Sequence, residues 1–328
     1  MIKLPLSVLE LVLVEQERSA AEALNSLPGL ARRVEELGYR RIWTTEHHGT
    51  PFLASATPQV LTAHLTAATS RIRVGSGGVM APNHAPFALA EQFATLSAIS
   101  GGRTDLGVGR GPGTRNEAIV RALRRGAEPA DEHAYRADVA ELLSHLGGES
   151  GITLLPGENP APEPWLLAAS PAGAELAAAQ GLPLAFGHHL QPGNTVEAVE
   201  RYREHFRPSK WRAEPYVLLS VQTICAATDA EAAYLAGPWK VLTAQLLEGT
   251  SVRARFLPAV QAAAYAMTPE IAAQVQEHCA HQAFGDRQTV TESLPTLAHT
   301  AGADELMLVT PIYEAQTRIS TYELVAAH

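Results

Sequence analysis

Residues Gly38–Thr114 read GYRRIWTTEHHGTPFLASATPQVLTAHLTAATSRIRVGSGGVMAPNHAPFALAEQFATLSAISGGRTDLGVGRGPGT. Three apolar, β-rich runs lie in this stretch, at Arg41–Thr45, Arg73–Val79 and Thr104–Val108. Each run leads directly into polar or glycine-rich residues, and helical segments separate the runs. This alternation predicts strand–helix–strand units and a parallel sheet. In a closed parallel barrel, the residues just past the strand ends form the active-site face.

The same alternation extends over the rest of the chain. Five further strands are predicted at Leu4–Leu9, Trp165–Ala169, Leu184–Phe186, Tyr216–Cys225 and Glu305–Val309. Thr228 and Glu231 predict a capped helix that runs toward Leu247. The chain is therefore expected to form one (β/α)8 TIM barrel, a single domain over residues 1–328. The stretch between strands seven and eight is longer than one helical connection needs, which predicts an excursion there.

Residues 249–269 are the least regular part of that excursion. Because they follow the C-terminal end of a strand, they are a candidate lid over the active-site face. A surface excursion that covers the flank of the barrel is the alternative, and the sequence favours neither.

Composition excludes several classes of function. Hydrophobic residues make up 46% of the chain and charged residues 18%, which is typical of a globular core. The net charge of −9 argues against a nucleic-acid partner. Cys225 and Cys279 lie outside any metal-ligand spacing and indicate a reducing compartment. With neither a signal peptide nor a long apolar run in the sequence, we expect a cytoplasmic protein that does not bind membranes and takes a small-molecule substrate.

Glu46, His47 and His48 follow the second predicted strand. An imidazole with a pKa near neutral can donate or accept a proton. Adjacent residues of an extended chain point in opposite directions, so one of the two histidines is expected to face the pocket. A structural histidine that caps the loop is the alternative. A metal site is a further alternative, but no other Cys or His spacing supports it.

Glycines and an arginine follow the next two strands. The run Gly75–Gly78 allows a ligand to approach the backbone closely, or marks a barrel corner without a ligand. Arg110 can grip a phosphate, or form a rim salt bridge with Glu91 or another acid. Ser170 begins a helix and creates an anion site there, or is a plain N-cap.

Other motifs give weaker signals. The run Gly107–Gly111 has the wrong spacing for a dinucleotide-binding turn, and no G-x-S-x-G motif supports a serine hydrolase. His188-His189, after the sixth strand, and Asn83-His84, after the third, are further pocket candidates. Most such histidines are polar loop residues.

Four motifs in order resemble the bacterial-luciferase-like flavin-dependent monooxygenases. They are Glu46-His47-His48, Val74-Gly75-Ser76-Gly77-Gly78-Val79, Gly102-Arg103-Thr104-Asp105 and Arg110-Gly111. The match is strongest from Leu4 to Thr114, and weaker matches continue to the C-terminus. The resemblance implies a TIM-barrel monooxygenase that uses reduced FMN and O2, receives FMNH2 from a separate flavin reductase, and forms a homodimer through helices beside strands two and three.

The resemblance also implies roles for individual residues. His47 is implied as the catalytic residue near the reactive flavin edge, where it stabilises or protonates the oxygen adduct. Gly77 and Gly78 are implied to support the flavin ring from behind, through a non-prolyl cis peptide. Arg110 and Ser170 are implied to anchor the phosphate, and Ala169 is a further implied cofactor-binding residue. Gly173 departs from the family pattern, which has a hydroxyl residue at that helix.

Two alternatives stay open. The first is a deazaflavin-dependent oxidoreductase on the same barrel, which moves hydride without O2. The second is a non-catalytic flavin-binding protein, although the presence of His47 argues against it. The walls of the substrate pocket come from loops, so the sequence does not identify the substrate.

Overall fold

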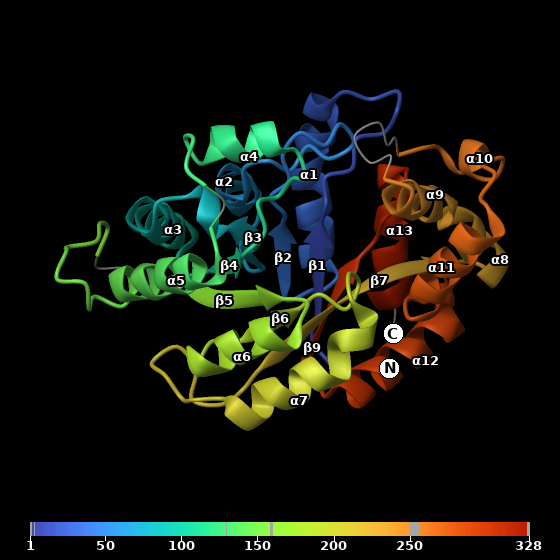
Figure 1. Ribbon diagram of the computed structural model, residues 1–328. Coiled ribbons are helices and arrows are strands. Elements are labelled where there is room, and N and C mark those ends of the chain that lie inside the picture. Colours follow the sequence, from blue (N-terminus) through green and yellow to red (C-terminus); the bar gives the residue numbers. More distant parts are fainter. Residues whose placement is uncertain (1, 3, 129, 158–159, 250–255, 327–328) are drawn as a thin grey trace.

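The computed structural model describes residues 2, 4–128, 130–157, 160–249 and 256–326. Eight of the nine strands in this described part form a closed parallel barrel (Figure 1). They are β1 (Leu6–Glu10), β2 (Arg41–Thr44), β3 (Arg73–Met80), β4 (Thr104–Gly109), β5 (Glu163–Ala168), β6 (Leu184–Phe186), β7 (Val217–Ala226) and β9 (Glu305–Val309). β1 pairs with β2 and β9, and β6 pairs with β7, so the ring closes. The predicted TIM barrel is confirmed.

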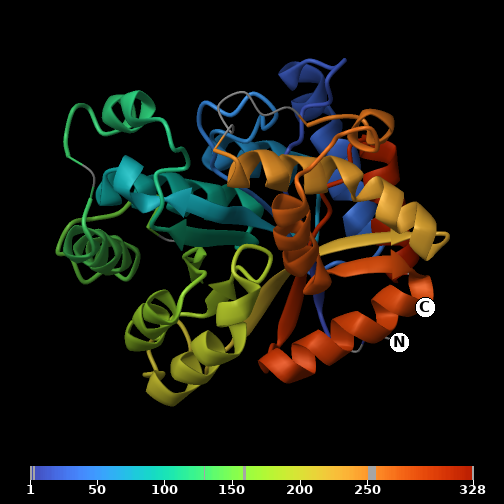
Figure 2. The ribbon, with the colours of Figure 1, turned by 45° about the vertical axis from the view of Figure 1, so that its right-hand side comes forward.

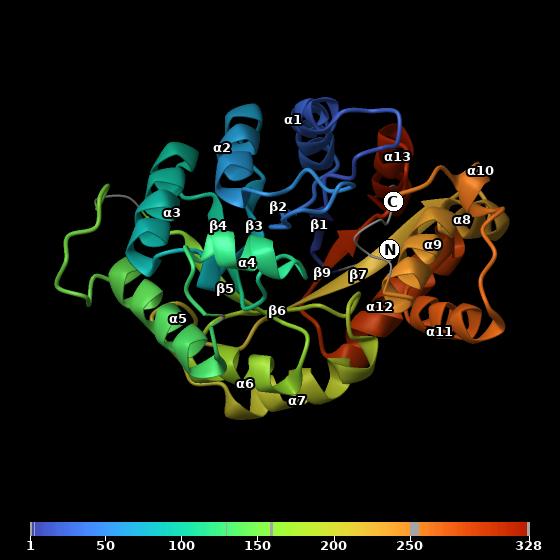
Figure 3. The ribbon, with the colours of Figure 1, turned by 45° about the horizontal axis from the view of Figure 1, so that its top comes forward.

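Helices surround the barrel (Figure 3). They are α1 (Ala20–Glu36), α2 (Pro58–Ala68), α3 (Pro86–Ser100), α5 (Glu132–Leu146), α6 (Pro171–Ala179), α7 (Thr195–His205), α12 (Arg287–Ala301) and α13 (Ala315–Ala326). Local sequence sets their ends: Ser19 and Glu22 form a capping box before α1, and Gly101 ends α3 with a φ of 66°. None of the described helices is long and apolar enough to cross a membrane.

Strand alternation divides the core into two layers. Outward side chains pack against the helices, and inward ones fill the barrel. The inner cluster contains Leu9, Trp43, Trp165, Leu218 and Met307. Counting onward from these residues in steps of two identifies the side chains that point into the C-terminal mouth of the barrel.

The excursion after β7 is confirmed, but its organisation differs from the prediction. It contains α8 (Asp229–Leu235), α9 (Gly237–Leu247), α10 (Ala259–Ala262), α11 (Pro269–Ala280) and β8 (Ala283–Asp286). The prediction of one continuous helix toward Leu247 is wrong, because a new helix, with Pro238 in its first turn, begins after a break at Ala236. β8 was not predicted; it pairs with the last four residues of β7, outside the barrel. Figure 2 shows these helices on the side of the barrel away from α5.

The candidate lid is described only in part. Residues 250–255 lie outside the described residues. Phe256 is buried and packs with Leu13, Phe52 and Tyr313, so this part of the excursion covers the loops that follow β1 and β2. The lid role and the single-domain assignment stay predictions.

One further helix lies over the C-terminal rim. α4 (Glu117–Leu123), which was not predicted, contacts the loop after β2: an added Cβ at Gly49 would lie 2.1 Å from Ile119 Cδ1. Arg124 at the end of α4 donates to Pro82 O at 2.6 Å, in the short 3-10 helix η1 (Ala81–Asn83) that follows β3.

Candidate functional site

A buried carboxylate joins the ends of β2 and β3. Glu46 accepts hydrogen bonds from Met80 N at 2.9 Å and Asn83 Nδ2 at 3.0 Å, and it contacts the imidazole Nε2 of His48 at 2.9 Å and of His84 at 3.0 Å. Burial by itself raises the pKa of Glu46, but the bonds from His84, His48 and Asn83 lower it below its ordinary value. Glu46 therefore stays ionised and holds the rim loops, and His48 has a structural role.

The loop that carries Arg110 is tied to the same rim. The amide of His48 donates to Gly113 O at 2.8 Å. Gly113 has a φ of 70°, and an added Cβ would lie 2.9 Å from Glu46 O, so only glycine is accommodated there. The position of Arg110 relative to His47 is thus set by contacts between their loops.

His47 is held through one ring nitrogen. Its Nδ1 lies 3.0 Å from Thr45 Oγ1, which lies 3.1 Å from Ser55 Oγ. Because the Ser55 hydroxyl donates to Thr45 O, the Thr45 hydroxyl donates to Ser55 and accepts from His47 Nδ1–H. Within the described residues no hydrogen bond engages His47 Nε2, which is left as an acceptor. The inward position of Thr45, two residues past Trp43, directs this ring toward the barrel mouth.

Burial also fixes the charge of His47. Desolvation, followed by the nearby charge of His48, lowers the pKa of His47 to about 4, against a smaller opposite effect of Glu46. The imidazole is therefore neutral at physiological pH. A neutral, anchored imidazole can exchange a hydrogen bond or a proton with a bound group without carrying a resting charge.

Glycines form part of the inner barrel wall near His47. An added Cβ at Gly77 would lie 2.6 Å from Leu9 Cδ1, and one at Gly107 would lie 2.2 Å from Ser76 O. Packing inside the protein therefore already requires glycine at both positions, as the barrel-corner alternative supposes. The Gly77–Gly78 peptide, whose isomer the sequence did not decide, is cis.

Arg110 lies at the rim with its side chain 60% exposed. Its Nη1 is 3.2 Å from Glu132 Oε2, and Arg136 contacts the same carboxylate at 2.6 Å. This is the rim salt bridge that the sequence offered as an alternative, with Glu132 rather than Glu91 as the acid. Exposed ion pairs contribute little to stability, so the guanidinium can leave this contact for a stronger anion at little cost.

Ser170 acts as an N-cap: its Oγ accepts from Gly173 N at 3.3 Å. The carbonyl of Ala169 accepts from Asn194 Nδ2 at 3.0 Å. An added Cβ at Gly173 would lie 2.9 Å from Ala168 Cβ, which gives a steric reason for the departure from the family pattern at this position. Ser170 and Arg110 do not contact each other in a described hydrogen bond, so an anion bound by both would have to bridge them.

The mouth of the barrel also holds an amide that sequence reasoning missed. Gln222 is the second inward residue after Leu218 on β7, and it is fully buried. Both polar atoms of its side chain are enclosed, and neither has a hydrogen-bond partner among the described residues. An unpaired buried amide is costly, by about 1–3 kcal/mol per group. Its presence fits a group with its own donors and acceptors, as a flavin has, and no local sequence signal marks it.

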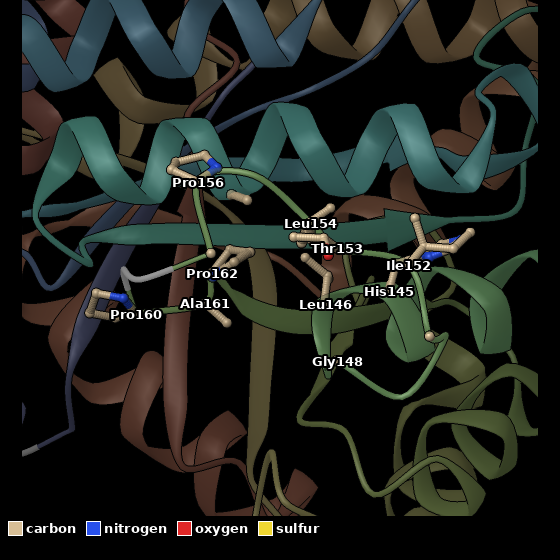
Figure 4. Close-up of a pocket in the computed structure, with 13 residues that line it drawn as sticks. His145, Leu146, Gly148, Ile152, Thr153, Leu154, Pro156, Pro160, Ala161 and Pro162 are labelled. Carbon is tan, nitrogen blue, oxygen red and sulfur yellow. The ribbon is translucent and has the colours of Figure 1, made fainter.

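The cavity shown in Figure 4 is a different feature. It has a volume of about 440 Å³ and is lined by Leu146, Leu154, Pro160 and other residues that lead into β5. It therefore lies toward the N-terminal ends of the strands, away from His47, and we do not assign it to the site. No cluster of three or more potential metal ligands occurs in the described part of the chain.

Comparison with known proteins identifies the relatives of this chain. A family profile described as luciferase-like monooxygenase matches residues 6–305. The chain is 37% identical over 325 residues to the uncharacterised protein YvbT of Bacillus subtilis, covering 98% of this chain and 95% of YvbT. It is 34% identical over 321 residues to a luciferase-like monooxygenase of Escherichia coli, covering 97% and 95%. The crystal structure of apo-MsnO8 matches with a TM-score of 0.90 and 34% identity, covering 98% and 97%.

More distant structures share the fold alone. One is the oxygenating constituent of 3,6-diketocamphane monooxygenase of Pseudomonas putida in complex with FMN, with a TM-score of 0.72 and 18% identity over 99% of this chain and 98% of that one. Another is an F420-dependent secondary alcohol dehydrogenase, with a TM-score of 0.65 and 16% identity over the full length of both chains. Proteins with this fold thus include one solved in complex with FMN and one that depends on F420.

Proposed function

The chain belongs to the luciferase-like monooxygenase family, and we propose that it is a monooxygenase that uses reduced FMN and O2 on a small organic substrate. The observation that supports this proposal most directly is His47: a neutral imidazole, anchored through Nδ1, with Nε2 left for a ligand at the barrel mouth. A reduced flavin supplies the electrons that activate O2. A separate flavin reductase would deliver FMNH2, as in the family the sequence resembles.

In this proposal each residue of the site has its own role. Gly77 and Gly78 present a side-chain-free wall for the flavin ring, and His47 holds or moves a proton at its Nε2 beside the ring. Arg110 and the Ser170 end of α6, together with Ala169, hold the phosphate. The alternative, a deazaflavin-dependent hydride transfer, predicts tight binding of a deazaflavin and no O2 consumption. Titration with each cofactor and an oxygen electrode separate the two.

The phosphate assignment predicts the effect of replacing Arg110. Arg110→Ala should weaken FMN binding by about 1.5–3 kcal/mol, the size of a hydrogen bond to a charged group. Riboflavin, which lacks the phosphate, should bind both proteins equally. Fluorescence titration of FMN and riboflavin measures both affinities.

Arg136 provides a matched control for this experiment. It is an exposed arginine on the same carboxylate, Glu132, so Arg136→Ala perturbs the same ion pair and leaves Arg110 in place. FMN affinity should stay at the wild-type value in that variant. Equal FMN affinity in Arg110→Ala and wild type would place the phosphate elsewhere.

The outer faces of α2 and α3 support the homodimer. These two helices contain only two ionisable residues, His64 and Glu91. Val60 on α2 is 65% exposed and Ile99 on α3 is 63% exposed. Outer helices of a soluble barrel usually carry charges on the solvent side. Two copies of a face with almost no charge can pack together without burying unpaired charges. We therefore propose that a second copy of this chain covers it.

Ile99→Glu tests this interface. The wild type should sediment as a dimer, and the variant as a monomer at micromolar concentration, because an unpaired carboxylate in an apolar interface costs several kcal/mol, or more than about 10²-fold in dimer affinity. Val196→Glu, an exposed valine on α7, is the control and should leave the dimer intact. A monomeric wild type would refute the interface.

A further inference from the structure

A second histidine at the barrel mouth is arranged like His47. His189 Nδ1 lies 2.8 Å from Ser220 Oγ, and the Ser220 hydroxyl donates to Phe186 O at 3.0 Å. Because that hydroxyl proton is already used, Ser220 accepts from His189, which places the ring proton on Nδ1. No described residue forms a hydrogen bond to His189 Nε2, so this nitrogen is left as an acceptor.

The neighbouring His188 shows what a structural histidine looks like here. Its Nδ1 lies 2.7 Å from Thr195 Oγ1 and its Nε2 lies 2.7 Å from His281 O, so both nitrogens are used inside the protein. His189 and His47 each have only Nδ1 engaged. His188 is therefore fully bonded inside the protein, whereas His47 and His189 each leave one ring nitrogen for a ligand.

Contacts around His189 hold it neutral and in place. Burial lowers the pKa of His189 to about 3, and positive charge on His188, His278 or His47 would lower it further, against the bond to Ser220. His47 follows β2 and His189 follows β6, on opposite sides of the ring of strands, so the two histidines lie at the same mouth of the barrel. His278 on α11 lies beside the backbone of His189.

The unpaired amide of Gln222 belongs to the same wall. Ser220 and Gln222 are consecutive inward residues of β7, since both share the side of Leu218. Gln222 is the last β7 residue paired with β9, and the strand then leaves the barrel to pair with β8. The ends of β6 and β7 thus place an acceptor, His189 Nε2, beside an amide that can donate and accept.

We propose that His189 and Gln222 recognise the imide edge of the bound flavin, in which an N–H lies between two carbonyl groups. His189 Nε2 accepts from the imide N–H, and the Gln222 amide donates to a flanking carbonyl. The pairing gives the enclosed Gln222 amide the partner it lacks. FMN and deazaflavins carry the same imide, so the inference rests on the proposed flavin-dependent function but not on which flavin binds.

The test combines a change in the protein with a change in the ligand. FMN and 3-methyl-FMN, whose imide N–H is replaced by N–CH3, are titrated against wild type and against His189→Phe. We expect methylation to weaken binding to the wild type by about tenfold, the loss of one hydrogen bond together with an unpaired acceptor. His189→Phe should bind FMN about tenfold more weakly than the wild type does. In this variant, 3-methyl-FMN should bind less than about twofold more weakly than FMN.

Spectroscopy provides a second measurement that does not depend on a substitution. In protein labelled with 15N-histidine, the His189 Nε2 resonance should move on addition of FMN, and the His188 resonances should not. Gln222→Leu should lower FMN affinity while leaving the His189 tautomer unchanged.

The outcomes separate the inference from the proposed function. If neither FMN nor a deazaflavin binds the wild type, the proposed function fails. If FMN binds, but methylation weakens wild type and His189→Phe by the same factor and the His189 Nε2 resonance stays in place, the inference is overturned and the proposed function stands.

Discussion

Replacing His47 by alanine is expected to shorten about 10²-fold the delay before oxidised FMN reappears when the protein, reduced FMN and O2 are mixed. His47 is a neutral imidazole whose position depends on Thr45, and the variant removes the polar group that it presents to the site. FMN affinity should change less than threefold or so, because the phosphate and imide contacts lie elsewhere. Stopped-flow absorbance measures the delay, and fluorescence titration measures the affinity.

Two controls distinguish a direct role from general disturbance. His48→Ala removes the adjacent imidazole, which contacts Glu46, and should lower stability without shortening the delay. Thr45→Val removes the anchor of His47 and should produce an intermediate delay. Equal delays in His47→Ala and wild type would reduce His47 to a structural role.

The pKa of His47 predicts how this delay depends on pH. With a folded pKa of about 4, His47 binds its proton only as the pH falls through that value. In the wild type the contribution of His47 should therefore be constant from pH 8 to about 5.5, and change only at lower pH. An inflection near 6.5, the ordinary imidazole pKa, would contradict the buried state described for this side chain.

The sequence predicted the barrel because each strand is a compact apolar run followed by a polar or glycine-rich turn. The structure reproduces Leu184–Phe186 and Glu305–Val309 with the same bounds and the other six strands within one or two residues at each end. The failures have physical reasons. α4 is only seven residues long and buries none of them, and β8 is only the four residues AFGD, so both are too short for a clear periodic pattern.

The site was predictable where one local motif supplies the residue. His47 follows a strand within a recognisable tripeptide, and only one of its two histidines was expected to face the pocket. Gln222 lies in the middle of a buried strand, and its unpaired amide becomes visible only when the barrel closes around it. The tautomer of His189 likewise depends on Ser220, which is distant in sequence.

A buried ion-pair cluster at the N-terminal end of the barrel was likewise not predictable from local sequence. Arg41 begins a predicted strand, but its side chain is fully buried and bonds to acids far along the chain. Its Nε lies 2.8 Å from Glu305 Oε1, and its Nη1 lies 2.7 Å from Asp105 Oδ2. Its guanidinium carbon also lies 4.5 Å from the centre of the Trp165 ring. Burial opposes the charge on Arg41, but these acids raise its pKa above the ordinary value, so the cation persists.

Arg41→Met is therefore expected to lower the unfolding free energy by about 3–5 kcal/mol, because it leaves two buried carboxylates without their shared cation. Arg73 still reaches Asp105 at 2.6 Å. In the described part of the chain, no other cation lies as close to Glu305 as Arg41 does, since Arg40 is 3.7 Å away. Urea denaturation followed by circular dichroism measures the loss. Arg40→Met, which removes the adjacent, partly exposed arginine, should cost less than about 1 kcal/mol.

A double variant tests the electrostatic cause. If the loss comes from an uncompensated charge, Arg41→Met combined with Glu305→Gln should be more stable than Arg41→Met alone, since a neutral amide costs less to bury than an unpaired carboxylate. Lower pH should also reduce the deficit of Arg41→Met, because a carboxylate without its cation binds a proton more readily. If the second substitution only adds to the damage, the loss comes from the packing of the Arg41 side chain against Trp165 rather than from its charge.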